Sequence, residues 1–171
     1  MMQIPIICVN YKSEQIKDYF KNGSSFGVNI DYIEEKKRLG TAGALGLVKT
    51  LESDPFFVIN GDVLTTINFE KLMNFHVSSR ASATMCVREY EMKMPYGAVT
   101  ADSNGNILAL REKPISKFLI NSGVYVLNPS VLSEIPLGEY FDMPNLFEKM
   151  ITKSFNTIIY QVSDYWIDIG S

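Results

Sequence analysis

Two aspartates stand where a hard cation could be held. Asp62 stands three positions beyond the end of residues 55–59, an apolar run typical of a buried strand. Ligands of open α/β sheets bind beyond the carboxyl ends of the strands, and Mg²⁺ prefers one or two carboxylates together with phosphate oxygens. Asp168 lies between two isoleucines, where an unpaired carboxylate is costly to bury, so we expect it to face solvent or to meet a cation. For Asp62 alone, a turn aspartate bonded to its own backbone is an equally good interpretation.

A glycine-containing segment, residues 39–45 (LGTAGAL), falls between an expected strand and an expected helix. Glycines there let a ligand approach the backbone closely, and amides at a helix start suit polar or anionic groups. The alternative is structural: Gly40 ends a turn and Gly43 packs the helix against a strand. Spacing alone favours this alternative, because pairs of glycines are common.

Three further polar residues have two interpretations each. Lys113 ends an expected strand just before a proline, so it is held in place and could meet a phosphate, although lysine is more often a solvated surface charge. Asn121 lies within an apolar strand, where its amide needs partners from a ligand or from the protein. His76, on a face of an expected helix, is best interpreted as structural.

The elements that must position these residues alternate in the first half of the chain and become mostly strands in the second. The apolar patterns predict strands at 4–10, 28–33, 55–59, 83–88, 97–101, 107–111, 118–127 and 157–162, with a short segment at 166–169. Helices are predicted at 14–20, at 41–51 with Thr41 as cap, from Asn68 through Phe75, and at 144–151. This order predicts an α/β fold, a Rossmann-like mixed and mostly parallel sheet flanked by helices, formed by one domain over residues 1–171.

Composition narrows the class of protein. The 171 residues, 46% hydrophobic and 20% charged, suit one globular domain, and the net charge of −3 argues against a nucleic-acid surface. No apolar run approaches the ~18 residues that cross a bilayer, and the first ten residues lack the basic start of a signal peptide. Cys8 and Cys86 lie in apolar runs, which favours buried thiols and a cytoplasmic protein over the alternative, a disulfide between the two.

Taken together, five segments resemble the sugar-1-phosphate nucleotidyltransferases, and among them the branch similar to mannose-1-phosphate guanylyltransferases. The segments are 39–43 (LGTAG), 60–62 (NGD), 95–97 (PYG), 112–114 (EKP) and 166–170 (WIDIG). None is decisive alone, but the five occur in the family's order over the whole chain.

The resemblance implies a function and a role for each matching residue. The implied reaction joins a nucleoside triphosphate and a sugar-1-phosphate into a nucleotide-activated sugar, with release of pyrophosphate and with Mg²⁺ as cofactor. By this resemblance Asp62 and Asp168 bind Mg²⁺, and Lys113 contacts the sugar phosphate. The implied nucleotide-binding residues are Glu35, Gly40, Thr41, Gly43 and Gly61. The implied sugar-binding residues are Gly97, Glu112 and Asn121.

The chain also departs from the family's pattern. The family begins with a strand and a Gly-rich triphosphate loop that have no counterpart here, so we expect a gap in the sheet and little activity from this chain alone. A non-catalytic sugar-nucleotide binding or regulatory module is the alternative function. An NAD-binding domain would need a Gly-x-Gly-x-x-Gly segment where Asn10 and Tyr11 stand, and a related glycosyltransferase would show an Asp-x-Asp segment near Asp62. The sequence leaves open the base, the sugar and whether the chain forms a homo-oligomer.

Overall fold

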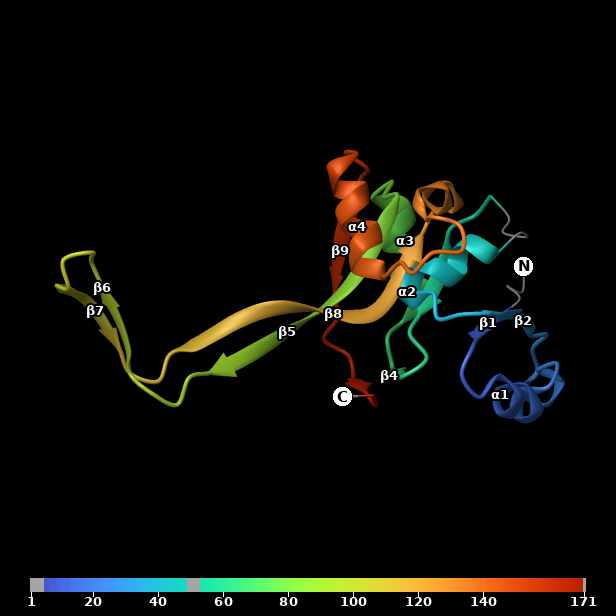
Figure 1. Cartoon of the computed structure of the whole chain (residues 1–171), viewed down its shortest axis with the longest axis horizontal. Coiled ribbons are helices and arrows are strands. Elements are labelled where there is room, and N and C mark those ends of the chain that lie inside the picture. The colour runs from blue at the N-terminus through green and yellow to red at the C-terminus, as the bar shows by residue number, and fades with distance from the viewer. Residues whose placement is uncertain (1–4, 49–52, 171) are drawn as a thin grey trace.

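The computed structural model describes residues 5–48 and 53–170. Its strands are β1 (Ile6–Val9), β2 (Asp31–Glu34), β3 (Phe56–Ile59), β4 (Val63–Thr65), β5 (Ala83–Lys93), β6 (Ala98–Ala101), β7 (Ile107–Arg111), β8 (Ile115–Leu127), β9 (Thr157–Gln161) and β10 (Trp166–Asp168). Its α-helices are α1 (Ser13–Phe20), α2 (Gly40–Gly43), α3 (Phe69–Ser78) and α4 (Met143–Thr152), and short 3₁₀ helices are formed by Ser24–Phe26, Ala44–Leu47 and Pro129–Glu134. Figure 1 shows that most elements form a body from which a long two-stranded arm projects.

The body is built on a four-stranded sheet with the order β3-β8-β5-β9. Strand β8 is antiparallel to both β3 and β5, and β9 is parallel to β5. Three of the four strands therefore run the same way, with β8 opposed to them. This arrangement confirms the expected α/β fold with a mixed sheet.

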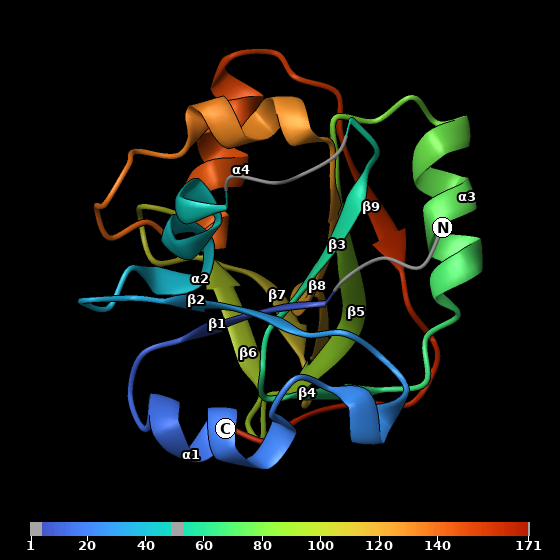
Figure 2. The same cartoon turned by 90° about the vertical axis from the view of Figure 1, so that its right-hand side faces the viewer.

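Helices cover both faces of this sheet. Successive residues of β8 point to opposite faces, so its side chains pack in two separate clusters. Tyr125 and Leu127 belong to a buried cluster with residues of α4, including Leu146. Val124 and Val126 belong to a second cluster, with Leu72 of α3. The near-continuous apolar run of β8 thus reflects burial on both faces. Figure 2 shows α3 and α4 on opposite sides of the sheet.

His76 of α3 has the structural role expected of it. The side chain is buried, with Nδ1 2.8 Å from the hydroxyl of Thr84 and Nε2 3.1 Å from the side-chain oxygen of Asn128. These contacts join α3 to β5 and to the residue that follows β8.

The first two strands form a separate parallel pair. β1 pairs with β2 over four residues, and within the described residues neither strand is hydrogen-bonded to β3. The four-stranded sheet and the β1–β2 pair are therefore not joined into one sheet.

Cys8 of β1 is exposed while Cys86 of β5 is buried, and both are free thiols. The expectation of a buried thiol is wrong for Cys8, because the described residues leave part of this strand uncovered.

The arm is formed by the outer halves of β5 and β8 and by the β6–β7 hairpin at their tip (Figure 1). The sequence predicts β5 only to residue 88 and β8 only from residue 118. In the structure the two strands stay paired from Arg88 and Ile120 out to Lys93 and Ile115. Each strand satisfies the backbone groups of the other there, so the ladder continues beyond the core.

The helix expected at 41–51 is much shorter. α2 spans only Gly40–Gly43, a 3₁₀ helix follows at Ala44–Leu47, and Val48 is extended. The rest of the expected helix lies outside the described residues. Leu39, and not Thr41, occupies the N-cap position. Local patterning overestimated the helix because Gly40 and Gly43 are packed closely against residues 139–142.

Candidate active site

Asp62 and Asp168 lie side by side although 106 positions separate their numbers. Asp62 follows β3, and the antiparallel pairing of β4 with β10 places Asp168 opposite Val63. The carbonyl of Asp62 accepts a hydrogen bond from the amide of Ile169 (2.8 Å). A Cβ atom at Gly170 would lie 2.8 Å from Oδ2 of Asp62 and 3.3 Å from Oδ1 of Asp168. Both carboxylate oxygens lie close to this one point, so the two side chains are near enough to share a ligand.

The terminal strand β10 is fixed by side chains of the central sheet. The indole N–H of Trp166 donates to the carbonyl of Ser122 in β8 (2.7 Å). Arg88 of β5 donates to the carbonyl of Trp166 (3.3 Å), and its guanidinium lies 5.9 Å from the centre of the indole ring. Trp166 therefore ties the segment that carries Asp168 to the strands that carry the core.

The glycine turn is held by an aspartate that lies 101 positions later. Thr41 donates to Oδ1 of Asp142 from its amide (2.9 Å) and from its hydroxyl (3.3 Å). The amides of Ala42 and Gly43 both donate to the carbonyl of Phe141 (3.0 and 2.9 Å). The expectation of exposed amides for an anionic group is wrong for these three donors, because the protein's own acceptors occupy them.

A pocket of about 390 Å³ opens beside this turn. Its lining residues are Asn10, Tyr11, Glu35, Arg38, Gly40, Thr41 and Asp142. Glu35 accepts a hydrogen bond from the amide of Leu39 (2.9 Å). The carboxylate of Glu35 therefore holds the start of the turn, and that of Asp142 holds its end at Thr41. Of the expected nucleotide-binding residues, Glu35, Gly40 and Thr41 line the pocket, whereas Gly43 is buried behind them. Gly61 lies apart from it, next to Asp62.

The charge of Asp142 is stabilised locally. The hydroxyl of Tyr140 donates to Oδ2 (2.6 Å), and together with the two Thr41 bonds and nearby Arg38 it holds the pKa of Asp142 below its usual range. The same contact raises the pKa of Tyr140. The pocket thus presents an ionised carboxylate at neutral pH, a group that accepts hydrogen bonds and cannot donate them.

Three of the expected sugar and phosphate residues lie on the arm. Gly97 and Glu112 face each other across its outer part, since a Cβ atom at Gly97 would be 3.1 Å from Oε2 of Glu112. Lys113 is exposed and has a left-handed backbone (φ 44°). The arm projects away from the body that holds Asp62 and Asp168 (Figure 1). The structure therefore groups these three residues with one another, and it does not place them beside the carboxylate pair.

Comparison with known proteins shows the family. A family model described as "Nucleotidyl transferase" matches residues 1–171. The chain belongs to the nucleotidyl transferase family. It is 36% identical over 172 residues to the mannose-1-phosphate guanylyltransferase catalytic subunit beta of Drosophila melanogaster, covering 96% of this chain and 46% of that protein. It is 33% identical over 186 residues to a UTP–glucose-1-phosphate uridylyltransferase of Synechocystis, covering 96% and 47%. The chain thus spans about half the length of these curated relatives.

Solved structures agree with this family. The fold is similar to that of HddC from Yersinia pseudotuberculosis, with a TM-score of 0.69, 26% identity, and coverage of 96% of this chain and 72% of that one. A structure of HddC complexed with GMP-PN gives a TM-score of 0.69 at 25% identity, covering 97% and 72%. A putative glucose-1-phosphate thymidylyltransferase from Bacillus anthracis shares the fold, with a TM-score of 0.70 at 19% identity, covering 97% and 70%. The resemblance to sugar-1-phosphate nucleotidyltransferases is confirmed.

Asn121 of β8 lies two residues before Gly123, whose carbonyl accepts the amide of Asn60 just after β3, and the side-chain amide of Asn121 is already engaged. It donates to the hydroxyl of Tyr125 (2.6 Å) and accepts from the amide of Gly123 (3.0 Å). Gly123 has a left-handed backbone (φ 72°), and a Cβ atom there would lie 2.9 Å from the side-chain nitrogen of Asn60. These bonds favour the structural interpretation of Asn121, with one amide hydrogen left over for another partner.

Four residues that line the pocket were not predicted from the sequence: Asn10, Tyr11, Arg38 and Asp142. Asp142 had a local signal, because it stands just before a helix with a proline in its first turn, which is typical of an N-cap. Its hydrogen bond to Thr41, which lies 101 positions earlier in the chain, had no such signal.

Within the part of the chain that the structure describes, no helix is long and apolar enough to cross a membrane.

Proposed function

We propose that this chain provides the metal carboxylates and the base pocket of an enzyme that joins a nucleoside triphosphate to a sugar-1-phosphate. The products are a nucleotide-activated sugar and pyrophosphate. The observation that carries the proposal is the convergence of Asp62 and Asp168 beside Gly170. The names of the guanylyltransferase and uridylyltransferase relatives support this class of substrates, and the GMP-PN complex of HddC supports a nucleotide ligand.

The proposed reaction needs little covalent chemistry from the protein. An oxygen of the sugar phosphate attacks the α-phosphorus in line, the new P–O bond forms, and the bond from that phosphorus to the pyrophosphate oxygen breaks. No redox partner is required, and positioning and charge stabilisation account for most of the catalysis. The side chains that position the two anions are therefore the ones to test.

Asp62 and Asp168 are the proposed ligands of Mg²⁺. Their chemistry fits this ion, because two nearby carboxylates leave the remaining coordination positions to phosphate oxygens and water. When bound, Mg²⁺ would reduce the repulsion between the two phosphates. The carboxylates then set where the two phosphates meet.

The pocket beside the glycine turn is the proposed site of the base and ribose. Glu35 and Asp142 offer carboxylate oxygens to N–H and O–H groups of the ligand, while Gly40 and Thr41 form the wall between them. Gly43 supports that wall from behind, since a Cβ atom there would lie 2.7 Å from the carbonyl oxygen of Glu139. Gly61, with nothing within 4 Å of its Cβ position, leaves open space next to Asp62, where the phosphates are proposed to lie.

The sugar phosphate is proposed to meet Lys113, with Gly97, Glu112 and Asn121 near the sugar. Asn121 lies at the base of the arm and the other three on its outer part, so a productive complex requires these arm residues to approach the carboxylate pair. A cytoplasmic location is proposed from the two free thiols and the acidic composition.

Nucleotide binding by this 171-residue chain tests the proposal directly. GTP, UTP, GDP-mannose and UDP-glucose would be titrated by calorimetry with and without Mg²⁺, and pyrophosphate release would be followed with mannose-1-phosphate or glucose-1-phosphate. We expect at least one nucleotide to bind in a Mg²⁺-dependent way. Asp62→Asn should weaken that binding at least about tenfold, because it removes a charged ligand of the ion. Asp18→Asn, an exposed aspartate of α1, is the matched control and should bind like the wild type.

Each outcome separates one interpretation from another. Failure of every nucleotide to bind the folded chain would refute the proposal. Unchanged Mg²⁺-dependent binding by folded Asp62→Asn would refute the metal assignment alone. Tight binding without pyrophosphate release, in this chain and in the full-length gene product, would favour a non-catalytic sugar-nucleotide binding module.

A further inference from the structure

The strand that carries Asp168 is weakly held by its own pairing. In the described part of the chain β10 is paired with β4 alone, and each of the two strands is three residues long. The hydroxyl of Thr65 and the amide of Thr66 extend this pairing, since both donate to the carbonyl of Tyr165 (2.9 and 3.0 Å). Two-stranded sheets are marginally stable in water. A further attachment is therefore needed to keep β10 against the body.

The carboxylate of Asp168 follows the backbone of this segment closely. Its Oδ1 accepts a hydrogen bond from the amide of Gly170 (2.8 Å), two positions further along the chain. The amide of Ile169 between them donates to the carbonyl of Asp62 (2.8 Å). A shift of the segment away from the body would therefore carry the Asp168 carboxylate with it.

Arg88 of β5 fastens this segment to the central sheet. Its Nη1 donates to the carbonyl of Trp166 (3.3 Å) and, over a longer distance, to that of Asp164 (3.5 Å). Its guanidinium lies 5.9 Å from the centre of the Trp166 ring. Hydrogen bonds from a charged donor are stronger than those between neutral groups, and a cation over an indole face adds attraction. One side chain thus holds both the backbone and the ring of the residue two positions before Asp168.

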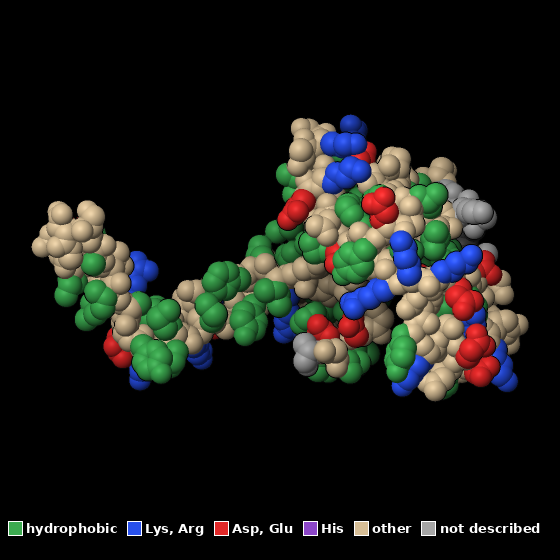
Figure 3. Space-filling view, in the orientation of Figure 1, with side chains coloured by type: hydrophobic (Ala, Val, Ile, Leu, Met, Phe, Trp, Pro, Cys, Tyr) green, Lys and Arg blue, Asp and Glu red, His purple; other side chains and the backbone are tan. Residues whose placement is uncertain are grey.

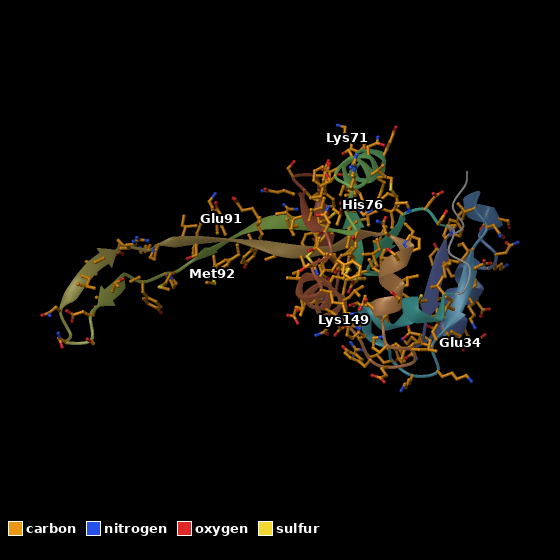
Figure 4. The ribbon with its side chains drawn as sticks, turned by 90° about the horizontal axis from the view of Figure 1, so that it is seen from above. Glu34, Lys71, His76, Glu91, Met92 and Lys149 are labelled. Carbon is orange, nitrogen blue, oxygen red and sulfur yellow. The ribbon has the colours of Figure 1, made fainter. Side chains whose placement is uncertain are left out.

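The place of Arg88 in the fold suits this task. β3 and β5 are both antiparallel to β8, so they end at the same edge of the sheet, and Asp62 follows β3 at that edge. Arg88 lies where β5 leaves the body, because Glu91 and Met92, three and four positions later, lie on the free arm in Figure 4. Figure 3 shows acidic side chains gathered on the body beside the root of the arm, with basic side chains next to them.

Two attachments of β10 meet at Trp166. Arg88 holds this residue from β5, and the indole N–H donates to the carbonyl of Ser122 in β8 (2.7 Å). Among the described residues the guanidinium of Arg88 forms no ion pair. No carboxylate therefore draws it away from residues 164–166, and the contacts with this segment are the ones that its charge serves.

We propose that Arg88 is a positioning residue, which holds β10 so that Asp168 stands beside Asp62 and the two carboxylates can share Mg²⁺. This inference rests on the proposed function, because the ion is the ligand proposed there. Arg88 acts through Trp166 and touches neither the ion nor the substrates. Replacing a residue that orients a metal ligand typically lowers metal affinity by about 10- to 100-fold. Arg88 should therefore control metal affinity without lining the nucleotide pocket, whose residues do not include it.

Replacement of Arg88 by methionine tests this role, because methionine keeps a flexible apolar stem and removes the guanidinium. Arg80→Met is the matched control. Arg80 is exposed, lies near the opposite end of β5, and its guanidinium has no hydrogen bond, ion pair or ring contact among the described residues. Mn²⁺ affinity would be measured by electron paramagnetic resonance with nucleotide present. We expect it to fall at least about tenfold in Arg88→Met and to remain unchanged in Arg80→Met.

A second measurement separates metal positioning from general damage to the site. Nucleotide affinity would be measured by calorimetry at low and at saturating Mn²⁺ concentrations. We expect Arg88→Met to bind nucleotide more weakly than the wild type at low Mn²⁺ and equally well at saturating Mn²⁺, because the intact pocket then compensates for nothing but the weaker ion site. A merely structural loss would not be restored by the metal.

Trp166 reports on β10 itself, because it is the only tryptophan of the chain. Acrylamide quenching of its fluorescence would be measured without metal or nucleotide. The quenching constant should rise in Arg88→Met and stay unchanged in Arg80→Met, since the indole loses the guanidinium beside it. Arg88→Lys keeps the positive charge but not the planar guanidinium. Its Mn²⁺ affinity should also fall below that of the wild type, and it decides the question if Arg88→Met does not fold.

Three results would overturn the inference. The first is wild-type Mn²⁺ affinity in the folded Arg88 variants, the second an equal loss in Arg80→Met, and the third a loss of nucleotide affinity in Arg88→Met that saturating Mn²⁺ does not restore. All three leave the proposed function standing, because the wild type would still bind nucleotide together with the metal. A wild type without metal-dependent nucleotide binding would instead refute the proposed function, and this inference with it.

Discussion

Replacing Gly40 by alanine is expected to destabilise the protein strongly, because two separate features of this position require glycine. Its backbone is left-handed (φ 79°), a conformation that costs a residue with a side chain roughly 1–2 kcal/mol. The added Cβ atom would also lie 2.6 Å from Oδ1 of Asp142 and 2.7 Å from the carbonyl oxygen of Phe141. That carbonyl cannot easily shift, since it accepts the amides of Ala42 and Gly43.

A second glycine, Gly138, allows the cost of the left-handed backbone to be measured apart from the cost of the close contacts. Its backbone is equally left-handed (φ 71°), but nothing lies within 4 Å of the position of its Cβ atom. Gly138→Ala should therefore cost only the backbone term, about 1 kcal/mol. Gly40→Ala adds a forced contact worth about 2 kcal/mol, for a loss of about 3 kcal/mol from a stability of the order of 10 kcal/mol. The smaller entropy of the unfolded alanine chain offsets part of both values and cancels in the comparison.

Urea denaturation followed by circular dichroism measures the difference. With an m-value of about 2 kcal/mol/M, the midpoint should fall by about 1.5 M for Gly40→Ala and by about 0.5 M for Gly138→Ala. Equal shifts for the two variants would show that the contacts with Asp142 and Phe141 are not what makes Gly40 necessary. A wild-type midpoint for Gly40→Ala would refute the left-handed turn itself.

Two further predictions concern single ionisable groups. The bonds from Tyr140 and Thr41 lower the pKa of Asp142, so its stabilisation is present above the usual carboxyl pKa of about 3.9 and is lost as the pH falls through the lower pKa of the folded state. The stability difference between wild type and Asp142→Asn, measured by urea denaturation at several pH values, should therefore close below about pH 4; a constant gap down to pH 2 would contradict this cause. For the thiols, a disulfide reagent should modify Cys8 in the native protein and Cys86 only on unfolding, because Cys8 is exposed and Cys86 is buried. Desolvation raises the pKa of both thiols, to about 11 for Cys8, with nearby Glu35 contributing, and to about 12 for Cys86, so access to the reagent and not acidity distinguishes them. Rapid native labelling of a Cys8→Ser variant would show that β5 is less protected than the structure indicates.

The elements with a strong local pattern could be predicted from the sequence. α3 begins after Asn68, whose side chain accepts from the amide of Lys71 (2.9 Å), and its apolar stripe ends near Ser78. α4 and the apolar β8 were predicted within a few residues for the same reason, a clear period of 3.6 or a continuous buried run. Residues 89–93 of β5 and 115–117 of β8 could not be predicted, because there each strand is held by its partner strand and neither packs against the core, so no burial pattern marks them.

The carboxylate pair shows the limit of local reasoning at the site. β4 and β10 are three residues long, so neither carries a periodic signal, and only their pairing brings Asp62 to Asp168. Only the resemblance to a family joined the two aspartates in the sequence. The same holds for the bond between Thr41 and Asp142. The roles of Gly97, Glu112 and Lys113 stay predictions, because the arm holds them apart from the carboxylates.

Gly170 offers a test of the proposed metal site that leaves both carboxylates in place. A methyl group there would lie 2.8 Å from Oδ2 of Asp62 and 3.3 Å from Oδ1 of Asp168, closer than a carbon atom normally approaches oxygen. Gly170→Ala should therefore push the two carboxylates out of the arrangement that one ion can share. Because Gly170 is exposed and its backbone is not left-handed, global stability should change by less than about 1 kcal/mol.

The matched control is Gly46→Ala, in the 3₁₀ helix Ala44–Leu47 and outside the segments that carry Asp62 and Asp168, where the atom nearest to the added Cβ would be a side-chain carbon of Ile135 at 3.4 Å, an ordinary contact. Mn²⁺ binding, measured by electron paramagnetic resonance with nucleotide present, should weaken at least about tenfold in Gly170→Ala and remain unchanged in Gly46→Ala. Equal Mn²⁺ affinities for the two variants would mean that the ion does not lie between Asp62 and Asp168. Equal losses in both variants would mean that a general effect of the added methyl group, and not the closeness of the two carboxylates, weakens the binding of the ion.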